Sequence, residues 1–307
     1  DGYFGSGVWF ASNVISVPIT GEQVSGEVVV TRNAFSLGTA PLLALDTDSS
    51  WQPAPNTTVS MTVDCNLIEG VTSVVDFDSA NRAASVIVDV HDNFFDGPDA
   101  VAFDVLHADR LYQRVARNHF TSSSVGVTTL DVDEQLVLFG QNLVSSPAAA
   151  FSITGEFVEQ STYGNLFYYT SFSSYATAEG ELGMLVAHRD NRHAAGDVEL
   201  VAYFQPSELS QSARPMAALH LERNQLLDVN ADDQDFVVIR RDLPSEPSRG
   251  TQTLLSTQSN FVTSSDLSKR LGSLYLGSAT IPEMSADHLC AVRSQGDWLS
   301  NMNGVQL

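Results

Sequence analysis

Two acidic stretches hold the residues best suited to chemistry in this sequence, because each places several oxygen-bearing side chains within a few positions. Calcium binds about six to eight hard oxygen atoms from carboxylates, amides, carbonyls and water. Carboxylates that recur within one turn are typical of a calcium site, and we expect one more to reach the first stretch from a neighbouring strand. The candidate metal ligands are Glu22, Asp92, Asp96 and Asp99 at the first site, and Asp228, Asn230, Asp232 and Asp235 at the second.

Each stretch also has a simpler interpretation. In an Asp-rich β-turn the carboxylates accept hydrogen bonds from nearby backbone groups, without any metal. The second stretch places oxygens at the first, third and fifth positions, as an EF-hand does. However, Asp233 stands where that loop needs a glycine, and Ile239 where it needs a bidentate glutamate. It is therefore not an EF-hand, and both a looser calcium loop and a solvated acidic turn remain open.

Patterns for catalysis and for transition metals are absent from the sequence. His188 and His193 have neither the i,i+4 spacing nor the adjacent Glu of a helical zinc site, so we expect them in a surface turn. No GxSxG nucleophile elbow is present, and no glycine-rich dinucleotide fingerprint follows a predicted strand. We therefore predict that the chain is not an enzyme and that calcium is its only cofactor.

The charge balance excludes nucleic acid as a partner. The chain has 37 acidic and 15 basic residues and a formal net charge of −22, and a field of this sign repels phosphate backbones and anionic lipids. Lys269 is the only lysine. An acidic, lysine-poor composition is typical of a protein surrounded by salt or divalent cations, which screen the self-repulsion, and equally of a genome that prefers arginine codons.

The two cysteines and the apolar runs indicate little about partners. Cys65 and Cys290 are too far apart for a close-spaced metal or redox motif, so a long-range disulfide and two buried free thiols both remain open. No run approaches the roughly 18 to 20 apolar residues of a membrane span. The chain starts at Asp1 without a leader pattern, which favours a mature exported protein.

Short β-branched segments with period-two alternation predict strands through most of the chain. The predicted strands are 27–32, 59–64, 84–90, 100–106, 135–139, 166–171, 182–188, 198–204 and 236–240. Turn residues separate them, and no amphipathic helix lies between them, which favours antiparallel pairing. The C-terminal part of the chain differs from this strand pattern, and short helices are expected at 266–271 and 286–293.

Residues 15–107 resemble a Calx-beta domain, a β-sandwich module whose members often bind calcium. In that family an early Glu precedes a Gly and a strand ending in Arg, and a later strand leads into an acidic turn and a final apolar strand. The matching residues are Glu22, Gly26 and Arg32, then Asp92, Asp96 and Asp99, then Phe103, Val105 and Leu106. The sequence departs from the family at His91, which replaces an Asp, and near Ala80, where a Gly is expected.

A possible repeat supports more than one domain. Asp92-Asn93 and Asp190-Asn191 lie 98 positions apart in similar surroundings, which fits either a duplicated sandwich domain or two unrelated hairpins. We predict an all-β protein of tandem antiparallel β-sandwich domains, Ig-like or Calx-beta-like, with a C-terminal extension that contains short helices. The expected parts are an N-terminal strand or arm at 1–19, sandwich domains at 20–120 and 121–242, and a linker and extension at 243–307.

These features predict an extracellular structural or adhesive subunit of a cell-surface assembly, such as a filament, coat or adhesin, stabilised by calcium. Its partners would be copies of itself or other surface subunits. The apolar segment 3–19 could add as a strand to a neighbouring subunit, or form the first strand of its own domain. The alternative is a secreted carbohydrate-binding or carbohydrate-active protein, with tryptophans and tyrosines on a sugar-binding face.

Overall fold

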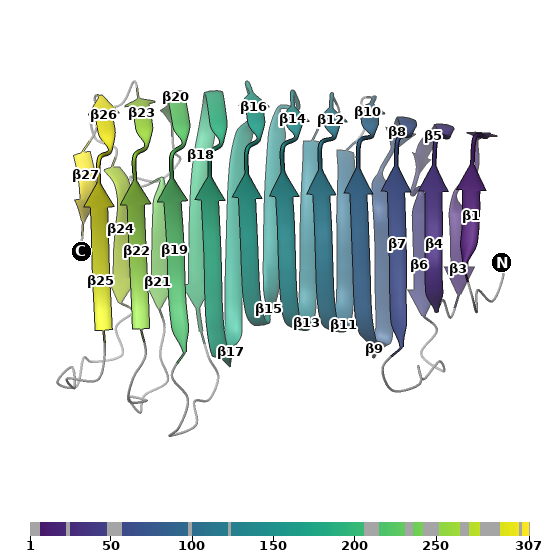
Figure 1. Ribbon diagram of the computed structural model, residues 1–307, viewed down its shortest axis with the longest axis horizontal. Helices are drawn as coiled ribbons and strands as arrows, with labels where there is room; N and C mark the ends of the chain where they lie inside the picture. The colour runs from purple at the N-terminus through teal and green to yellow at the C-terminus, as the bar shows by residue number, and fades with distance from the viewer. Residues whose placement is uncertain are drawn as a thin grey trace. The chain divides into compact units, whose positions relative to one another are not determined.

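The computed structural model describes strands and turns in two compact units, 1–152 and 153–307. The described residues are 7–22, 25–47, 57–97, 100–121, 124–205, 215–230, 236–241, 252–264, 270–276, 289–300 and 303–306. Within these ranges there is no helix (Figure 1). Consequently, among the residues that the structure describes, no helix is long and apolar enough to cross a membrane.

Unit 1 is a stack of coils in which every strand pairs in parallel with a strand of the next coil. Its strands are β1 (Val8–Ala11), β2 (Val14–Ile15), β3 (Ile19–Glu22), β4 (Gly26–Thr31), β5 (Ala34–Ala40), β6 (Leu43–Thr47), β7 (Thr58–Asp64), β8 (Leu67–Val71), β9 (Ser73–His91), β10 (Phe94–Asp96), β11 (Ala100–Ala116), β12 (His119–Phe120), β13 (Ser124–Gly140) and β14 (Leu143–Val144). β15 (Ala148–Tyr163) crosses the boundary between the units.

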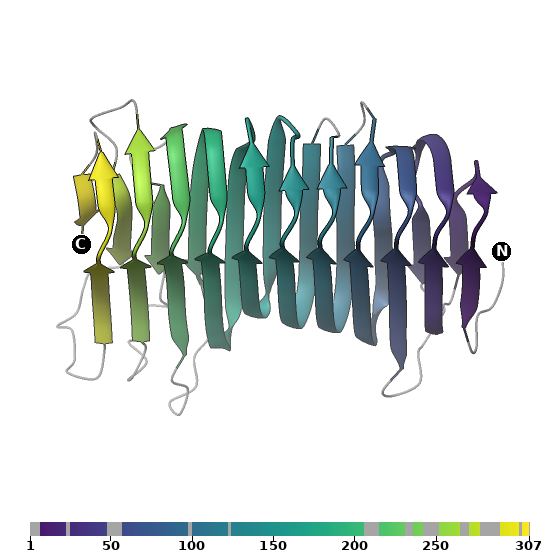
Figure 2. The ribbon, with the colours of Figure 1, turned by 45° about the horizontal axis from the view of Figure 1, so that its top comes forward.

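The parallel pairs of unit 1 form three ladders, one for each face of the coil. Ladder 1 runs through β1, β4, β7 and the C-terminal halves of β9, β11 and β13. Ladder 2 joins the short strands β2, β5, β8, β10, β12 and β14 (Figure 2). Ladder 3 contains β3, β6 and the N-terminal halves of β9, β11 and β13. This arrangement is a parallel β-helix.

Unit 2 repeats the same three-ladder arrangement. Its strands are β16 (Leu166–Tyr168), β17 (Ser171–Arg189), β18 (Arg192–Phe204), β19 (Met216–Glu222), β20 (Gln225–Asn230), β21 (Val237–Arg241), β22 (Gln252–Gln258), β23 (Phe261–Ser264), β24 (Arg270–Leu276), β25 (Leu289–Gln295), β26 (Trp298–Ser300) and β27 (Asn303–Gln306). Ladder 1 includes β17, β19, β22 and β25, ladder 2 includes β16, β18, β20, β23 and β26, and ladder 3 includes β17, β18, β21, β24 and β27.

Alternating side chains fill the interior of each coil, as expected for strands with one buried face. Because parallel strands are in register, identical residue types stack on one another along the coils. In unit 1, Phe95 stacks on Phe120 with ring centroids 4.9 Å apart, Phe120 lies 6.1 Å from Phe139, and Phe139 lies 4.9 Å from Phe151. Such a column buries large aromatic area at every coil.

A residue with left-handed backbone conformation turns the chain from ladder 1 into ladder 2. In unit 1 this residue is Ser12, Arg32, Cys65, Asp92, Arg117 or Gln141, with φ between 56° and 59°. A residue other than glycine costs roughly 1 to 2 kcal/mol in this conformation. The next residue offsets that cost, because it is an asparagine whose amide ties successive coils together.

These asparagines form a buried hydrogen-bonded ladder. Asn66 is typical: its backbone N–H and its Nδ2 both donate to Asn93 Oδ1, at 2.9 and 3.0 Å. The same Nδ2 donates to the carbonyls of Asp64 and Val30, both at 2.9 Å. In unit 1 the ladder consists of Asn13, Asn33, Asn66, Asn93, Asn118 and Asn142. Each member thus satisfies backbone groups that the corner would leave unpaired.

The ladder of unit 2 runs through Asn165, Asn191, Asn224 and Asn260 to Asp297. Asp297 Oδ1 accepts from the backbone N–H of Asn260 at 2.9 Å and from its Nδ2 at 2.8 Å. A carboxylate has no N–H to donate, and Asp297 Oδ2 instead accepts from the hydroxyls of Thr257 and Ser294, at 2.8 and 2.7 Å.

The prediction of antiparallel β-sandwich domains is wrong. Six of the nine predicted strands lie within strands of the structure, and 27–32 and 236–240 each extend one residue beyond one. The range 166–171 instead covers β16, the turn after it and the first residue of β17. The described pairs are all parallel, and each partner lies one coil away. Period-two alternation shows only that one face of a strand is buried. Antiparallel pairing would require turns that reverse the chain, but the turns here lead it into a different ladder. The strands of the other two ladders then form the crossover connection that parallel strands need.

The predicted helices and the predicted repeat are corrected in the same way. Residues 270–271 and 289–293 lie in β24 and β25, and the remaining residues of both predicted helices lie outside the described residues. Asn93 and Asn191, which matched over 98 positions, are both ladder asparagines, and Asn118, Asn142 and Asn165 stand between them in sequence. The spacing therefore covers four short repeats and not one sandwich domain.

We expect Asn93→Ala to lower the free energy of unfolding by about 3 kcal/mol, because it leaves the buried Asn66 N–H and Val63 carbonyl without partners. Asn13→Ala is the matched control, since Asn13 is exposed and only donates within the ladder, and its loss should be about 1 kcal/mol or less. Urea unfolding followed by circular dichroism measures both. Equal losses would contradict a structural role for the ladder.

Candidate functional site

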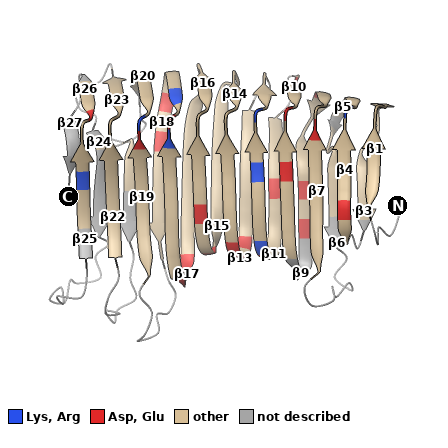
Figure 3. Ribbon diagram, viewed as in Figure 1, with Lys and Arg blue, Asp and Glu red and all other residues tan. Residues whose placement is uncertain are grey.

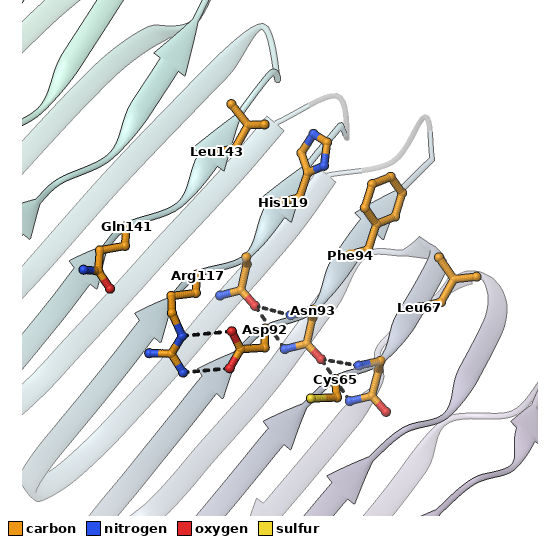
Figure 4. Close-up of a pocket in the computed structure, with 11 residues that line it drawn as sticks. Cys65, Leu67, Asp92, Asn93, Phe94, Arg117, His119, Gln141 and Leu143 are labelled. Atoms are coloured by element: carbon orange, nitrogen blue, oxygen red, sulfur yellow. Dashed lines mark hydrogen bonds and ion pairs between the residues drawn. The ribbon is translucent and has the colours of Figure 1, made fainter.

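An open groove beside the corner of unit 1 brings together acidic, basic, aromatic, aliphatic and thiol side chains (Figure 4). Its floor is the asparagine ladder, and it is lined by the residues just before and just after each asparagine. The lining residues are Cys65, Asn66, Leu67, Asp92, Asn93, Phe94, Arg117, Asn118, His119, Gln141 and Leu143.

The residues after the asparagines form what we call the apolar row, consisting of Leu67, Phe94, His119 and Leu143. They are direct neighbours in register across β8, β10, β12 and β14. Phe94 and His119 pack edge to face with ring centroids 4.8 Å apart, and Phe94 is still 37% exposed. Neighbouring strands lie about 4.8 Å apart, so the row offers one side chain at each such step along the coils, aliphatic or aromatic at every position.

The residues before the asparagines form the corner row, consisting of Cys65, Asp92, Arg117 and Gln141. Arg117 Nε and Nη2 donate to the two oxygens of Asp92 at 2.8 and 2.7 Å, and His91 Nδ1 lies 2.8 Å from Asp92 Oδ2. The hydrogen bond from Arg117 lowers the pKa of Asp92 to about 2. Asp92 is therefore an ionised partner of Arg117 and not a proton donor at neutral pH.

Cys65, at the end of the corner row, is an exposed free cysteine. Partial burial, followed by the hydrogen bond and the negative charge of Asp64, raises the pKa of its thiol. A raised thiol pKa disfavours the reactive thiolate, so Cys65 lacks the activation of a nucleophilic cysteine.

A third row lies on the other side of the apolar row and is polar. Glu69 and Asp96 are register neighbours on β8 and β10. Thr121 Oγ1 donates to Asp96 Oδ1 at 2.6 Å. The apolar row is consequently flanked on both sides by groups that hydrogen-bond.

Several other arginines in both units pair with acids one coil away. Figure 3 shows how basic and acidic positions are distributed along the strands. Arg114 Nε and Nη2 donate to Asp89 at 2.8 Å each, and Arg223 pairs with Asp190 in unit 2 just as Arg117 pairs with Asp92 in unit 1. Because many of the few cations are used in this way, the surface that remains is acidic.

The structure places the predicted calcium ligands of the first site on different faces. Glu22 ends β3 in ladder 3 and is the register partner of Asp46, whereas Asp92 is at the corner and Asp96 in ladder 2. Asp99 lies outside the described residues.

At the second predicted site, Asp228 and Asn230 are the only candidates within the described residues, and both lie in β20. The Asp228 backbone N–H donates to Thr263 Oγ1 at 2.7 Å, and Asn230 is the register partner of Asp197. Asp232 and Asp235 lie outside the described residues. In the described part of the chain no group of three or more His, Cys, Asp or Glu could hold a metal ion.

The expectation of a surface turn for His188 and His193 is wrong. Both side chains are fully buried inside unit 2, with their Nε2 atoms 3.0 Å apart. Thr162 Oγ1 contacts His188 Nδ1, and Phe167 stacks on the His193 ring at 4.4 Å. His188 lies in β17 and His193 in β18, and both side chains face inward as part of the alternating pattern of these strands. The prediction failed because it assigned both histidines to the turn between the two strands.

The contacts of this pair assign its protons. His193 Nδ1 has no hydrogen-bond partner, so a proton there would be a buried, unpaired donor. The assignment that avoids this has His193 Nε2–H donating to His188 Nε2 and His188 Nδ1–H donating to Thr162 Oγ1, whose own hydroxyl faces the Ala187 carbonyl at 3.4 Å. Both rings are then neutral. Burial lowers the pKa of His188 to about 3, and burial together with His188 lowers that of His193.

The sequence reasoning missed the asparagine ladder and therefore the groove built on it. The signal that could have found them is an asparagine followed two positions later by a buried side chain, as in Asn66-Leu-Ile, Asn93-Phe-Phe and Asn118-His-Phe. Its spacing varies along the chain, so a search for one fixed period overlooks it.

Comparisons with known proteins return no relative. No family model matches the sequence, and neither a curated protein nor a solved structure matches it. The resemblance to a Calx-beta domain stays a prediction.

Calcium binding also stays a prediction, and thermal unfolding checks it. If either acidic stretch binds calcium, the melting temperature should be higher in calcium than in chelator, because a ligand that binds only the folded state stabilises it. Magnesium at the same ionic strength is the control for charge screening. Equal melting temperatures in all three conditions would contradict the prediction.

We expect the free energy of unfolding to fall as the pH drops below about 6.5, the pKa of an unfolded histidine. The folded pKa values of His188 and His193 are lowered, so the unfolded state binds more protons, and each histidine contributes a slope of up to about 1.4 kcal/mol per pH unit. His193→Phe should reduce this slope. Phe167→Leu, at a buried neighbour that does not titrate, should lower stability equally at every pH, and a wild-type slope in His193→Phe would contradict the expectation.

Proposed function

We propose that this chain is an extracellular adhesive surface protein that binds an extended, uncharged polysaccharide along the groove of unit 1. The observation that carries the proposal is the apolar row, with its exposed Leu67 and Phe94 and its half-buried His119, between two rows of hydrogen-bonding groups. Sugar rings have apolar faces and polar edges, so they suit aromatic side chains bordered by hydrogen-bonding groups.

The regular spacing of the groove favours a polymer over a small molecule. Each coil adds one member to the apolar row and one to the corner row, at intervals of about 4.8 Å. An open surface of this kind binds through several weak and equivalent contacts, so affinity should rise with the length of the ligand.

Charge favours a ligand without anionic groups. The net charge of −22 repels polyanions, and the positive charge of Arg117 within the groove is already neutralised by Asp92. Neutral glycans avoid this repulsion, whereas sulfated or uronic-acid polymers do not.

The ion pair between Arg117 and Asp92 favours glycan binding without hydrolysis. Glycoside hydrolysis needs one carboxylic acid with a raised pKa to protonate the leaving oxygen. The pKa of Asp92 is instead lowered to about 2 by Arg117, so the carboxylate of the corner row does not serve as that acid.

We expect Phe94→Ala to weaken binding of a neutral oligosaccharide about five- to tenfold, because an aromatic contact of this kind contributes roughly 1 kcal/mol. Tyr112→Ala is the matched control, since Tyr112 is also 37% exposed in unit 1 but projects from ladder 1. Isothermal titration with cello-, chito- and manno-oligosaccharides of increasing length measures both variants. Absence of binding to all three series, or equal losses in the two variants, would overturn the proposal.

A further inference from the structure

We propose that the first coil of unit 1 in one molecule docks edge to edge on the last coil of unit 2 in a second copy, so that the protein assembles head to tail. The inference goes beyond glycan binding and does not depend on it. It concerns two strand edges, β1 to β3 and β25 to β27, that each pair on one side only among the described residues.

The first coil exposes large apolar side chains. Val14 is 88% exposed and Trp9 is 70% exposed. Asn13 is the first ladder asparagine: its backbone N–H donates to Asn33 Oδ1 at 2.9 Å, whereas its own Oδ1 accepts no hydrogen bond from a described residue. The edge of unit 1 thus offers a ladder acceptor beside exposed apolar side chains.

The last coil presents the complementary groups. The carboxylate of Asp297 accepts four hydrogen bonds within unit 2, but its backbone N–H, which occupies the place of a ladder donor, donates to no described residue. Trp298 follows it and is 51% exposed, with its ring stacked on Phe261 at 4.2 Å and 4°. The edge of unit 2 thus offers a ladder donor beside an exposed aromatic ring.

The polarity of the ladder selects the partner. In both units the backbone N–H of each member points to the Oδ1 of the next, so a donor is left at the last coil and an acceptor at the first. Docking Asp297 N–H on Asn13 Oδ1 continues this pattern and sets Trp298 against Val14. Two first coils would oppose acceptor to acceptor, which disfavours a two-fold dimer.

Such an interface is heterologous, since it joins two different surfaces, and it produces a ring or an open polymer. The net charge of −22 opposes the approach of two copies. Salt screens that repulsion, because the Debye length falls from about 30 Å at 0.01 M to about 3 Å at 1 M. We therefore expect assembly to increase with ionic strength.

Light scattering coupled to size-exclusion chromatography tests the proposal on the 307-residue chain across concentration and salt. We expect species larger than a dimer at high salt. Val14→Lys at the first coil and Trp298→Lys at the last coil should each leave monomers, whereas Leu130→Lys, at a position that is 48% exposed on β13, should assemble as the wild type does. Circular dichroism checks that each variant is folded.

Mixing the two variants separates this geometry from general stickiness. The Val14→Lys protein keeps an intact last coil and the Trp298→Lys protein keeps an intact first coil, so an equal mixture should form dimers and nothing larger. A wild type that stays monomeric at every salt concentration, a wild type that stops at a dimer, or equal loss of assembly in Leu130→Lys would overturn the proposal. Oligosaccharide binding by Val14→Lys is measured separately, so failure of assembly is distinguishable from failure of the proposed glycan site.

Discussion

The structure depends on the hydrogen bonds that the buried asparagines make at the corner between ladders 1 and 2. A chain that turns there leaves main-chain N–H and carbonyl groups inside the protein, where each unpaired group costs about 1 to 3 kcal/mol. Asn66 and Asn93 satisfy those groups on their own coil and on both neighbours. The left-handed residue before each asparagine and the groove outside it both follow from that turn.

The ladder also fixes the register of the exposed rows. Because each asparagine holds the next at one strand spacing, the residues on either side of it are aligned from coil to coil. Phe94 lies beside His119, and Asp92 beside Arg117, for this reason. A regular track along the groove is thus a consequence of a buried constraint. The same constraint leaves an acceptor on Asn13 in unit 1 and a donor on Asp297 in unit 2 that no described residue pairs with.

The in-register alignment of the coils also places arginines next to acidic residues. Arginines such as Arg114 and Arg117 meet an acid on the preceding coil, so their charges are neutralised where the coils are in register. Exposed pairs of this kind contribute little individually, about 0 to 1 kcal/mol. Their larger effect is on recognition, since the unpaired acids that remain disfavour anionic ligands and oppose the approach of a second copy.

The sequence by itself determined the positions of some of the strands, the all-β class and the acidic composition, because alternation and composition are local properties. Only the tertiary structure decided that the pairing is parallel, that His188 and His193 are internal, and that the asparagines form a ladder. The physical reason is that the partners involved lie far apart in sequence: Asn66 and Asn93 are 27 positions apart, and Asn224 and Asn260 are 36 apart. The residues of a strand indicate which of its faces is buried. Its pairing partner is determined by hydrogen bonds to a strand that follows only after a full turn of the β-helix.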